Sequence, residues 1–183
     1  INVVNGKYEG DLIQYYMDGH IKQKSFFKEG KLNGKYIQYY DIPENAISEE
    51  EFYEKGVITG VYKTYYKNGK LSETGEFNND GEKTGVWKNY SEDNVLIAEE
   101  TFNKGKNSGI TKNHDNKGIL TEEFIYKNDM LQEYKAYAKD GKVIYQNKKE
   151  GKNNYDVLLY YPNGNKKKEG YVKNGQLDGK WKY

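Results

Sequence analysis

The amino-acid sequence repeats one short pattern along its whole length, and this repetition constrains the fold more than any other feature. Each repeat starts near a glycine, has an aromatic residue or a histidine five positions later, and often continues into an Asn-Gly or Asp-Gly pair. Such a period is the signature of a repeat array, so we take residues 1–183 as a single repeat domain. The repeats are 23–26 residues long and start at Gly10, Gly34, Gly60, Gly85, Gly109, Gln132 and Tyr155, with a partial repeat at 179–183.

The pattern within one repeat predicts a β-hairpin. Asn-Gly and Asp-Gly tolerate positive φ and favour tight turns between two strands. Beyond the turn, an aliphatic residue and an aromatic residue six positions later, such as Leu71 and Phe77, fall on the same face of a strand. A helix is excluded because glycines recur every ten to fifteen residues and apolar residues do not follow a helical period.

A single hairpin is barely stable in water, so the repeats must stack on one another to bury their aromatic rings. The predicted fold is therefore all-β, an elongated array of stacked antiparallel β-hairpins that forms a twisted sheet. Charged residues make up 31% of the chain, which taken alone favours disorder. Aromatic residues make up 15%, including 20 tyrosines, and tyrosine packs its ring while its hydroxyl stays at the water edge. We expect tyrosine to supply most of the buried apolar surface.

Charge and cysteine content exclude several classes of partner and site. All 29 basic residues are lysines and 28 acidic residues offset them, so the sequence lacks the basic excess and the arginines typical of nucleic-acid binding. The chain has no cysteine, which excludes disulfides and thiolate metal sites. No window is apolar enough to span a membrane, and the first residues lack the apolar core of a signal peptide. Both a cytoplasmic location and export after removal of a signal stay open.

Two adjacent columns of aromatic residues recur in the array. The first column, five residues after each repeat start, is predicted to be the structural core: Tyr15, Tyr39, Tyr65, Tyr90, His114, Tyr137 and Tyr160. The second column, one residue later, is Tyr16, Tyr40, Tyr66 and Tyr161. Adjacent residues of a strand point to opposite faces, so the second column is a candidate partly exposed ladder for a peptide, glycan or lipid headgroup. The alternative is that both faces pack as the sheet twists.

Other polar features favour structural roles. Acidic pairs such as Glu49-Glu50 recur in three repeats, and a recurring residue serves the repeat rather than a single site. Neither His20 nor His114 has a second histidine nearby, so we expect no metal site. The basic run at 166–168 adjoins acids and is interpreted as a solvated edge, with anionic lipid as the alternative. No nucleophile–base pair or phosphate loop is recognisable, so we expect no enzyme and no cofactor.

The last residues, GKWKY, reach one strand into a further repeat. Open strand edges invite pairing unless they are capped or occupied. We therefore expect Trp181 and Tyr183 to lie on a docking edge for a partner, for a second copy of the chain by strand addition, or for further repeats.

The repeat, written G-K-Y/W-x-x-Y-Y-x-N-G-x-L as in GVYKTYYKNGKL at 60–71, resembles the MORN repeat, in particular the bacterial MORN-variant repeat. This resemblance implies a sheet of stacked hairpins without catalytic activity that serves as an interaction module. Bacterial relatives are described as antitoxin-like, and others as surface or adhesion arrays. The second repeat departs from the pattern, because DIPENAIS replaces the tight turn and predicts a wider loop. The sixth and seventh repeats have lost apolar residues, so a bend or partner contact is expected there.

The leading functional hypothesis is a non-enzymatic scaffold that binds another protein, antitoxin-like or surface-associated, with self-association through strand edges as one form of it. The alternative is peripheral binding to anionic phospholipid or phosphoinositide. MORN repeats also accompany plant phosphatidylinositol phosphate kinases, so a kinase name for such a chain is inherited only from the shared repeats.

Overall fold

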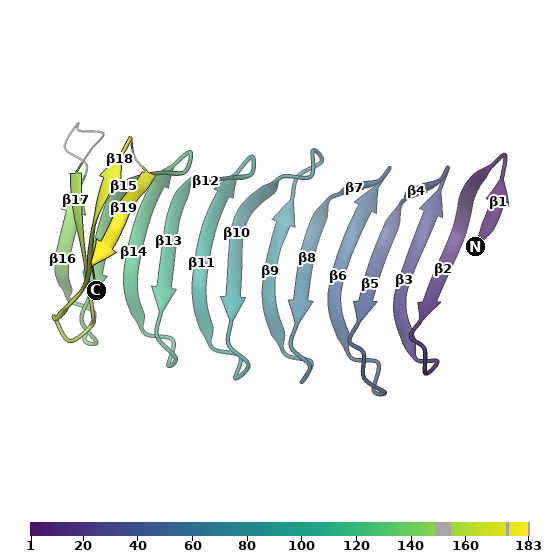
Figure 1. The fold of residues 1–183 in the computed structure, drawn as a ribbon, viewed down its shortest axis with the longest axis horizontal. Helices are drawn as coiled ribbons and strands as arrows, with labels where there is room; N and C mark the ends of the chain where they lie inside the picture. The colour runs from purple at the N-terminus through teal and green to yellow at the C-terminus, as the bar shows by residue number, and fades with distance from the viewer. Residues whose placement is uncertain (149–154, 175, 183) are drawn as a thin grey trace. The chain divides into compact units, whose positions relative to one another are not determined.

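The computed structural model describes residues 1–148, 155–174 and 176–182 (Figure 1). All regular elements within these ranges are β-strands, and neighbouring strands are antiparallel, which confirms the all-β fold of stacked hairpins. The chain divides into two compact units, Ile1–Asn94 and Val95–Tyr183, which we call the N-terminal unit and the C-terminal unit and describe in turn.

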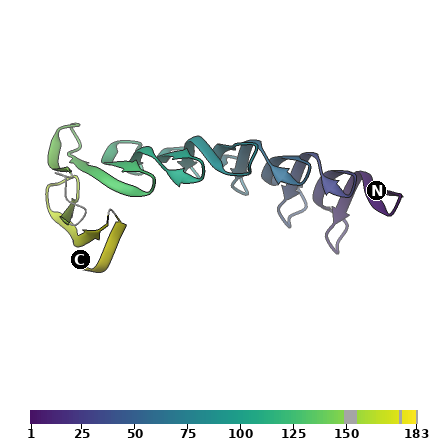
Figure 2. The same cartoon turned by 90° about the horizontal axis from the view of Figure 1, so that it is seen from above.

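The N-terminal unit is one antiparallel sheet in which sequence order and strand order coincide (Figure 2). Its strands pair in the order β1-β2-β3-β5-β6-β8-β9-β10, with the two-residue strands β4 and β7 paired to β3 and β6. Each predicted repeat is one hairpin, the first being β2 with β3. The bounds are β1 Asn2–Val4, β2 Lys7–Tyr15, β3 Ile21–Lys28, β4 Lys31–Leu32, β5 Gly34–Tyr39, β6 Ile47–Glu54, β7 Val57–Ile58, β8 Gly60–Tyr65, β9 Leu71–Phe77 and β10 Lys83–Tyr90.

The C-terminal unit contains two sheets. Strands β11, β13, β14, β15 and β16 pair in this order, with β12 paired to β11, whereas β17, β18 and β19 form a separate three-stranded sheet. The seventh hairpin, β17 with β18, therefore does not continue the predicted single array. The bounds are β11 Leu96–Asn103, β12 Lys106–Asn107, β13 Gly109–His114, β14 Leu120–Lys127, β15 Met130–Tyr137, β16 Val143–Lys148, β17 Tyr155–Tyr160, β18 Lys166–Lys173 and β19 Gln176–Lys182.

The predicted turns are present. In the third repeat Gly69 has a φ of 77°, and its N–H donates to the carbonyl of Tyr66 at 2.9 Å. Glycine reaches this φ without the steric cost that other residues incur. In the second repeat the loop is wider, as expected, because the N–H of Tyr40 reaches the carbonyl of Ala46 at 2.9 Å. Asn45, at a φ of 49°, takes the left-handed position there.

The main core of the N-terminal unit contains residues two positions after the repeat starts, rather than the residues five positions after them. Trp87 is 1% exposed, and its ring covers Gly75, where a Cβ atom would lie only 2.1 Å from the ring carbon Cδ2. Tyr62 and Phe77 complete the cluster, with ring centroids 5.3 Å and 5.1 Å from that of Trp87. Edge and tilted contacts of this kind stabilise aromatic pairs beyond the area they bury.

The prediction that the first tyrosine column is the core is therefore wrong for most of its members. Only Tyr39 is buried, and Tyr15 is 58% exposed. Positions two and five of a repeat are separated by an odd number of residues, so a strand directs them to opposite faces, and only one of the two faces holds the core. The half-buried members are Tyr65, Tyr90, His114, Tyr137 and Tyr160.

The core of the C-terminal unit joins its two sheets. Leu131 of β15, Val157 of β17 and Val172 of β18 are each at most 1% exposed and form one cluster. Phe124, Tyr126 and Leu159 pack against it. The seventh hairpin thus buries its aliphatic side chains against the face of the other sheet.

Candidate functional site

Three large apolar side chains stand half-exposed on strands β6, β8 and β10 of the N-terminal unit, with β9 between the last two. Phe52 of β6, Val61 of β8 and Val86 of β10 are 48%, 51% and 49% exposed. Phe52 and Val61 line one shallow hollow of about 300 Å³, and Val61 and Val86 line the next, of about 390 Å³. We call these three residues the exposed row. Strand alternation places them on the face opposite Trp87, which directly follows Val86.

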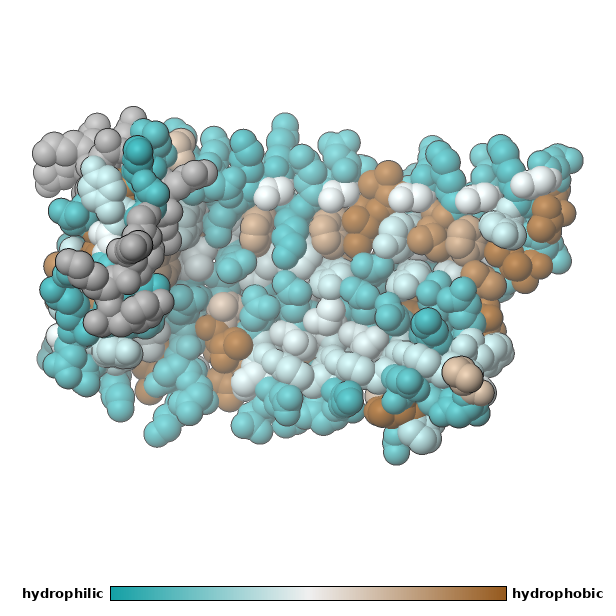
Figure 3. All heavy atoms as spheres, in the orientation of Figure 1, coloured by the Kyte–Doolittle hydropathy of each residue, from teal (hydrophilic) through white to brown (hydrophobic). Residues whose placement is uncertain are grey.

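Charged groups surround the exposed row. Lys35, the register partner of Phe52, lies 2.6 Å from Glu50, and the hydroxyl of Tyr65 donates to the other Glu50 oxygen at 2.7 Å. These two hydrogen bonds, the one from Lys35 first, lower the pKa of Glu50. Burial and the bond to Glu50 raise the pKa of Tyr65 to about 12. At neutral pH the row is therefore bordered by an ionised carboxylate, an ammonium group and a neutral hydroxyl. The space-filling view likewise shows apolar groups divided by hydrophilic ones (Figure 3).

The opposite face carries tyrosines whose hydroxyls are bonded to glutamates. Tyr62 donates to Glu49 at 2.8 Å, and Tyr53 donates to Glu51 at 2.8 Å. Burial is the main cause that raises the pKa of both tyrosines well above its usual range, and burial also raises the pKa of Glu51. In the first acidic pair, Glu49 thus bonds to a tyrosine of its own sheet and Glu50 to Lys35, a cross-strand lysine as the structural interpretation predicted.

The second tyrosine column links consecutive repeats. The hydroxyls of Tyr16, Tyr40 and Tyr66 donate to the backbone carbonyls of Tyr39, Tyr65 and Tyr90 at 2.8, 2.6 and 2.6 Å, across 23 to 25 residues. All three side chains are half-buried, which agrees with a partly exposed column, and their use as a binding ladder stays a prediction. Tyr161 is 49% exposed. The recurring Tyr-Tyr pair in the sequence marks the residues that form these hydrogen bonds. The alternation of side chains along a strand does not show which carbonyl accepts each hydroxyl.

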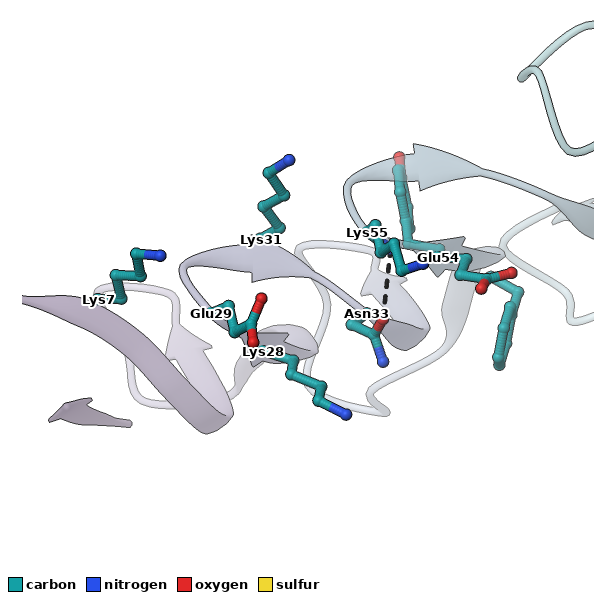
Figure 4. Close-up of a pocket in the computed structure, with 9 residues that line it drawn as sticks. Lys7, Lys28, Glu29, Lys31, Asn33, Glu54 and Lys55 are labelled. Atoms are coloured by element: carbon teal, nitrogen blue, oxygen red, sulfur yellow. Dashed lines mark hydrogen bonds between the residues drawn. The ribbon is translucent and has the colours of Figure 1, made fainter. Parts of the chain in front are cut away.

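A hollow with four lysines among its nine lining residues lies at the edge formed by the second turns (Figure 4). It has a volume of about 630 Å³, and Figure 4 shows Lys7 and Lys31 extending to the same side of the ribbon. The backbone N–H of Lys55 donates to Asn33 Oδ1 at 3.3 Å, which joins two consecutive turns. Sequence reasoning missed this hollow because its lysines are scattered and only stacking brings them together. The lining residues include Lys7, Lys28, Lys31, Lys55, Glu29 and Glu54.

Comparison with protein families gives three matches to one model. Residues 58–79, 83–104 and 156–174 match the MORN repeat variant. The chain contains MORN repeats. The first of these MORN repeats covers β8 and β9, and the last covers β17 and β18. A comparison with curated proteins found no match. In the part of the chain that the structure describes, no helix has the length and apolar character needed to cross a membrane.

In the last MORN repeat the predicted basic run is paired with acids. Lys166 lies 2.9 Å from Glu169, and Lys167 reaches Glu122 at 3.4 Å. Glu122 is only 5% exposed and also accepts a hydrogen bond from the hydroxyl of Tyr134 at 3.2 Å. Lys167 therefore holds its MORN repeat to the neighbouring sheet rather than standing at a purely solvated edge.

The structure does not describe the side chains that were predicted to form the docking edge. The side chain of Trp181 and the whole of Tyr183 lie outside the described residues. Their part in binding stays a prediction.

Proposed function

We propose that the chain is a non-enzymatic scaffold whose MORN repeats bind a protein partner against the exposed row of the N-terminal unit. The observation that carries this proposal is that Phe52, Val61 and Val86 each leave about half of their surface in water and line two successive hollows of one face. Exposed apolar side chains with a polar border are typical of protein interfaces. The MORN repeats are consistent with such a scaffold or binding role.

The polar groups of the N-terminal unit support binding rather than catalysis. The half-buried carboxylates Glu49 and Glu51 already accept tyrosine hydroxyls, and the ionised Glu50 is bonded to Lys35 and Tyr65. A general base needs a carboxylate within reach of a substrate proton. An antitoxin-like or surface-associated partner fits the resemblance to bacterial MORN-variant repeats and belongs to this proposal.

Site-specific photocrosslinking tests the proposal. The photoreactive residue p-benzoylphenylalanine is placed at position 52 or 61 of the full chain and irradiated in an extract of the native cell. We expect a discrete crosslinked product from both positions that excess unmodified chain competes away and that the substitution Val86→Glu abolishes. Met17 is 108% exposed in the first hairpin turn and serves as the control position. Crosslinking from position 17 that is as strong as from 52 and 61 would refute binding at the exposed row.

The lysine-lined hollow favours a second candidate function, the binding of an anionic phospholipid or phosphoinositide headgroup. Four lysines and two glutamates line it, which leaves an excess of positive charge. Each lysine near an anionic membrane contributes about 1 kcal/mol, and salt screens this attraction.

Vesicle co-sedimentation separates the two candidates. If the hollow binds headgroups, the chain sediments with phosphatidylcholine vesicles that contain phosphoinositide and is released at high salt. The double substitution Lys7→Glu and Lys31→Glu should then abolish sedimentation, whereas Val61→Glu should leave it unchanged. Equal sedimentation with pure phosphatidylcholine vesicles would argue against this candidate.

A further inference from the structure

The first two repeats meet at a histidine between two aspartates. His20 follows the first turn glycine, and its side chain is only 10% exposed. Its Nδ1 lies 2.5 Å from Asp18 Oδ1 in the same turn, and its Nε2 lies 3.0 Å from Asp41 Oδ1 in the wide loop of the second repeat. One ligand atom from each of the three residues falls within 4.8 Å of the others.

The hydrogen bonding of the imidazole ring points to a cation between His20 and Asp41. Asp18 Oδ1 is placed to accept a proton from Nδ1, and the tautomer that this contact favours has its lone pair on Nε2. Nε2 is buried and makes no hydrogen bond, although the Asp41 oxygen is only 3.0 Å away, so this oxygen lies off the axis of the Nε2 lone pair. A cation on that axis would have the off-axis oxygen within coordinating reach, whereas two acceptor atoms at this distance with no ion between them repel one another.

We propose that His20 and Asp41 bind a divalent transition-metal ion of the zinc class, with Asp18 orienting the imidazole. Zinc accepts histidine nitrogen and carboxylate oxygen at about 2.0–2.2 Å, and two such ligands at a tetrahedral angle lie about 3.4 Å apart. Asp41 is 69% exposed, so its carboxylate has room to move the few tenths of an ångström that separate 3.0 Å from this value. A carboxylate that accepts the second ring N–H of a metal-bound histidine is a common partner, because it holds the ring and raises its basicity.

The surrounding contacts hold the two loops in place for this site. The N–H of Ile21 donates to Asn45 Oδ1 at 2.9 Å, and the Tyr16 ring packs on the His20 ring with centroids 4.9 Å apart. The Tyr16 hydroxyl in turn bonds to Tyr39, two residues before Asp41. The metal would therefore fasten the wide loop of the second repeat to the turn of the first.

The two proposed ligands, His20 and Asp41, are not part of the repeat pattern, whereas Asp18 belongs to the recurring Asp-Gly turn pair. The position of His20 is Lys70 in the third repeat and Lys142 in the sixth, and the position of Asp41 is Met17 in the first repeat and Lys67 in the third. A residue that the hairpin itself required would recur, as the doublet tyrosines do. The combination of His20 with Asp41 instead belongs to one junction, where two loops of different length meet.

Metal titration of the full chain tests the site. The metal-free protein is titrated with zinc chloride by calorimetry, and with cobalt chloride by visible absorption, which reports the coordination geometry. We expect one equivalent to bind, no binding at this site in His20→Ala, and at least ten-fold weaker binding in Asp41→Asn. Asp18→Asn should weaken binding by about 10–100-fold, as loss of an orienting partner does. The matched control is His114→Ala, which removes the other histidine and should leave affinity and stoichiometry unchanged.

Nitrogen NMR of the wild-type chain keeps the test independent of variant folding. Zinc should shift the Nε2 resonance of His20 and leave both ring nitrogens of His114 in place. An unchanged His20 resonance at saturating zinc, or zinc binding that survives His20→Ala with full affinity, would overturn the proposal and leave a protonated His20 paired with both aspartates as the explanation of the cluster.

Discussion

The two units of this chain build their cores from the same kind of hairpin in different ways. In the N-terminal unit the deepest residue is Trp87, whose ring lies over Gly75 and against neighbouring aromatic rings of the same sheet. In the C-terminal unit Leu131, Val157 and Val172 form a buried aliphatic cluster, and they come from two sheets. A hairpin repeat can thus bury apolar surface along its own sheet or against a second sheet.

The third, fourth and seventh repeats differ at the residue two positions after the repeat start. In the third and fourth repeats this residue is Tyr62 or Trp87, which is large enough to cover a neighbouring strand without a second layer. In the seventh repeat it is Val157, which covers much less surface and becomes fully buried only when another layer packs on it. Aromatic side chains bury more area than aliphatic ones. A valine at this position therefore leaves more of the sheet to be covered by a second layer than a tyrosine or tryptophan does.

The largest expected effect separates the two cores. Trp87→Ala should lower the free energy of unfolding by about 3–5 kcal/mol, and Leu131→Ala by about 2–5 kcal/mol, because each leaves a cavity in a buried cluster. Urea unfolding measures the total loss, and amide hydrogen exchange locates it. Exchange should rise mainly in residues 1–94 for the first variant and mainly in residues 95–183 for the second. Equal loss of protection in both units from either variant would mean that they do not have separate cores.

The next largest expected effect on stability concerns Gly75, whose backbone lies close to the Trp87 ring. Gly75→Ala should destabilise the N-terminal unit by about 1–3 kcal/mol, because the added Cβ would lie 2.1 Å from the Trp87 ring. The double variant Gly75→Ala with Trp87→Ala should lose less than the sum of the two single losses, since the ring that clashes is gone. Additive losses in thermal unfolding would show that the ring does not constrain Gly75.

The tyrosine doublets offer a smaller and sharper comparison between the units. Tyr66→Phe removes the bond from its hydroxyl to the carbonyl of Tyr90 and should cost about 0.5–1.5 kcal/mol. Tyr161→Phe changes a side chain that is 49% exposed in the C-terminal unit and should stay within about 0.5 kcal/mol of wild type. Chemical denaturation of the two variants side by side measures the difference. A loss from Tyr161→Phe as large as from Tyr66→Phe would contradict the distinction.

The smallest expected effect is the contribution of Tyr65 to the change of the free energy of unfolding with pH. The pKa of Tyr65 is about 12 in the folded chain, above the ordinary value of 10.0. Between these two values the unfolded chain has lost protons that the folded chain keeps, so stability falls as pH rises. Tyr65→Phe removes this contribution and should make the fall between about pH 10 and pH 12 shallower in urea titrations. An unchanged slope would show that Tyr65 is not a source of it.

Much of the local structure of this protein could be read from its sequence. The glycines and the Asn-Gly pairs predicted the turns, and DIPENAIS predicted the wider loop that the bond from Tyr40 to Ala46 closes. Alternation within a strand also predicted that the two tyrosine columns point to opposite faces of the sheet. These features depend on backbone conformations that neighbouring residues set by themselves, so a sequence window contains the information.

Tertiary structure alone decided which side of the sheet became the core and what each polar group met there. Alternation with a period of two defines two faces of the sheet but does not say which face is covered. By sequence alone, either Tyr62 or Tyr65 could be the core residue, and it is Tyr62 on which the rings of Phe77 and Trp87 pack. The same holds for His20, whose second aspartate comes from the following repeat. The departure of the seventh hairpin from the first sheet also depends on contacts, because burying Val157 against Leu131 requires two segments that no local pattern connects. Whether a side chain is buried, and which polar groups it meets, depends on two segments packing together. A repeated sequence determines the local structure of each segment but not which other segment packs on it.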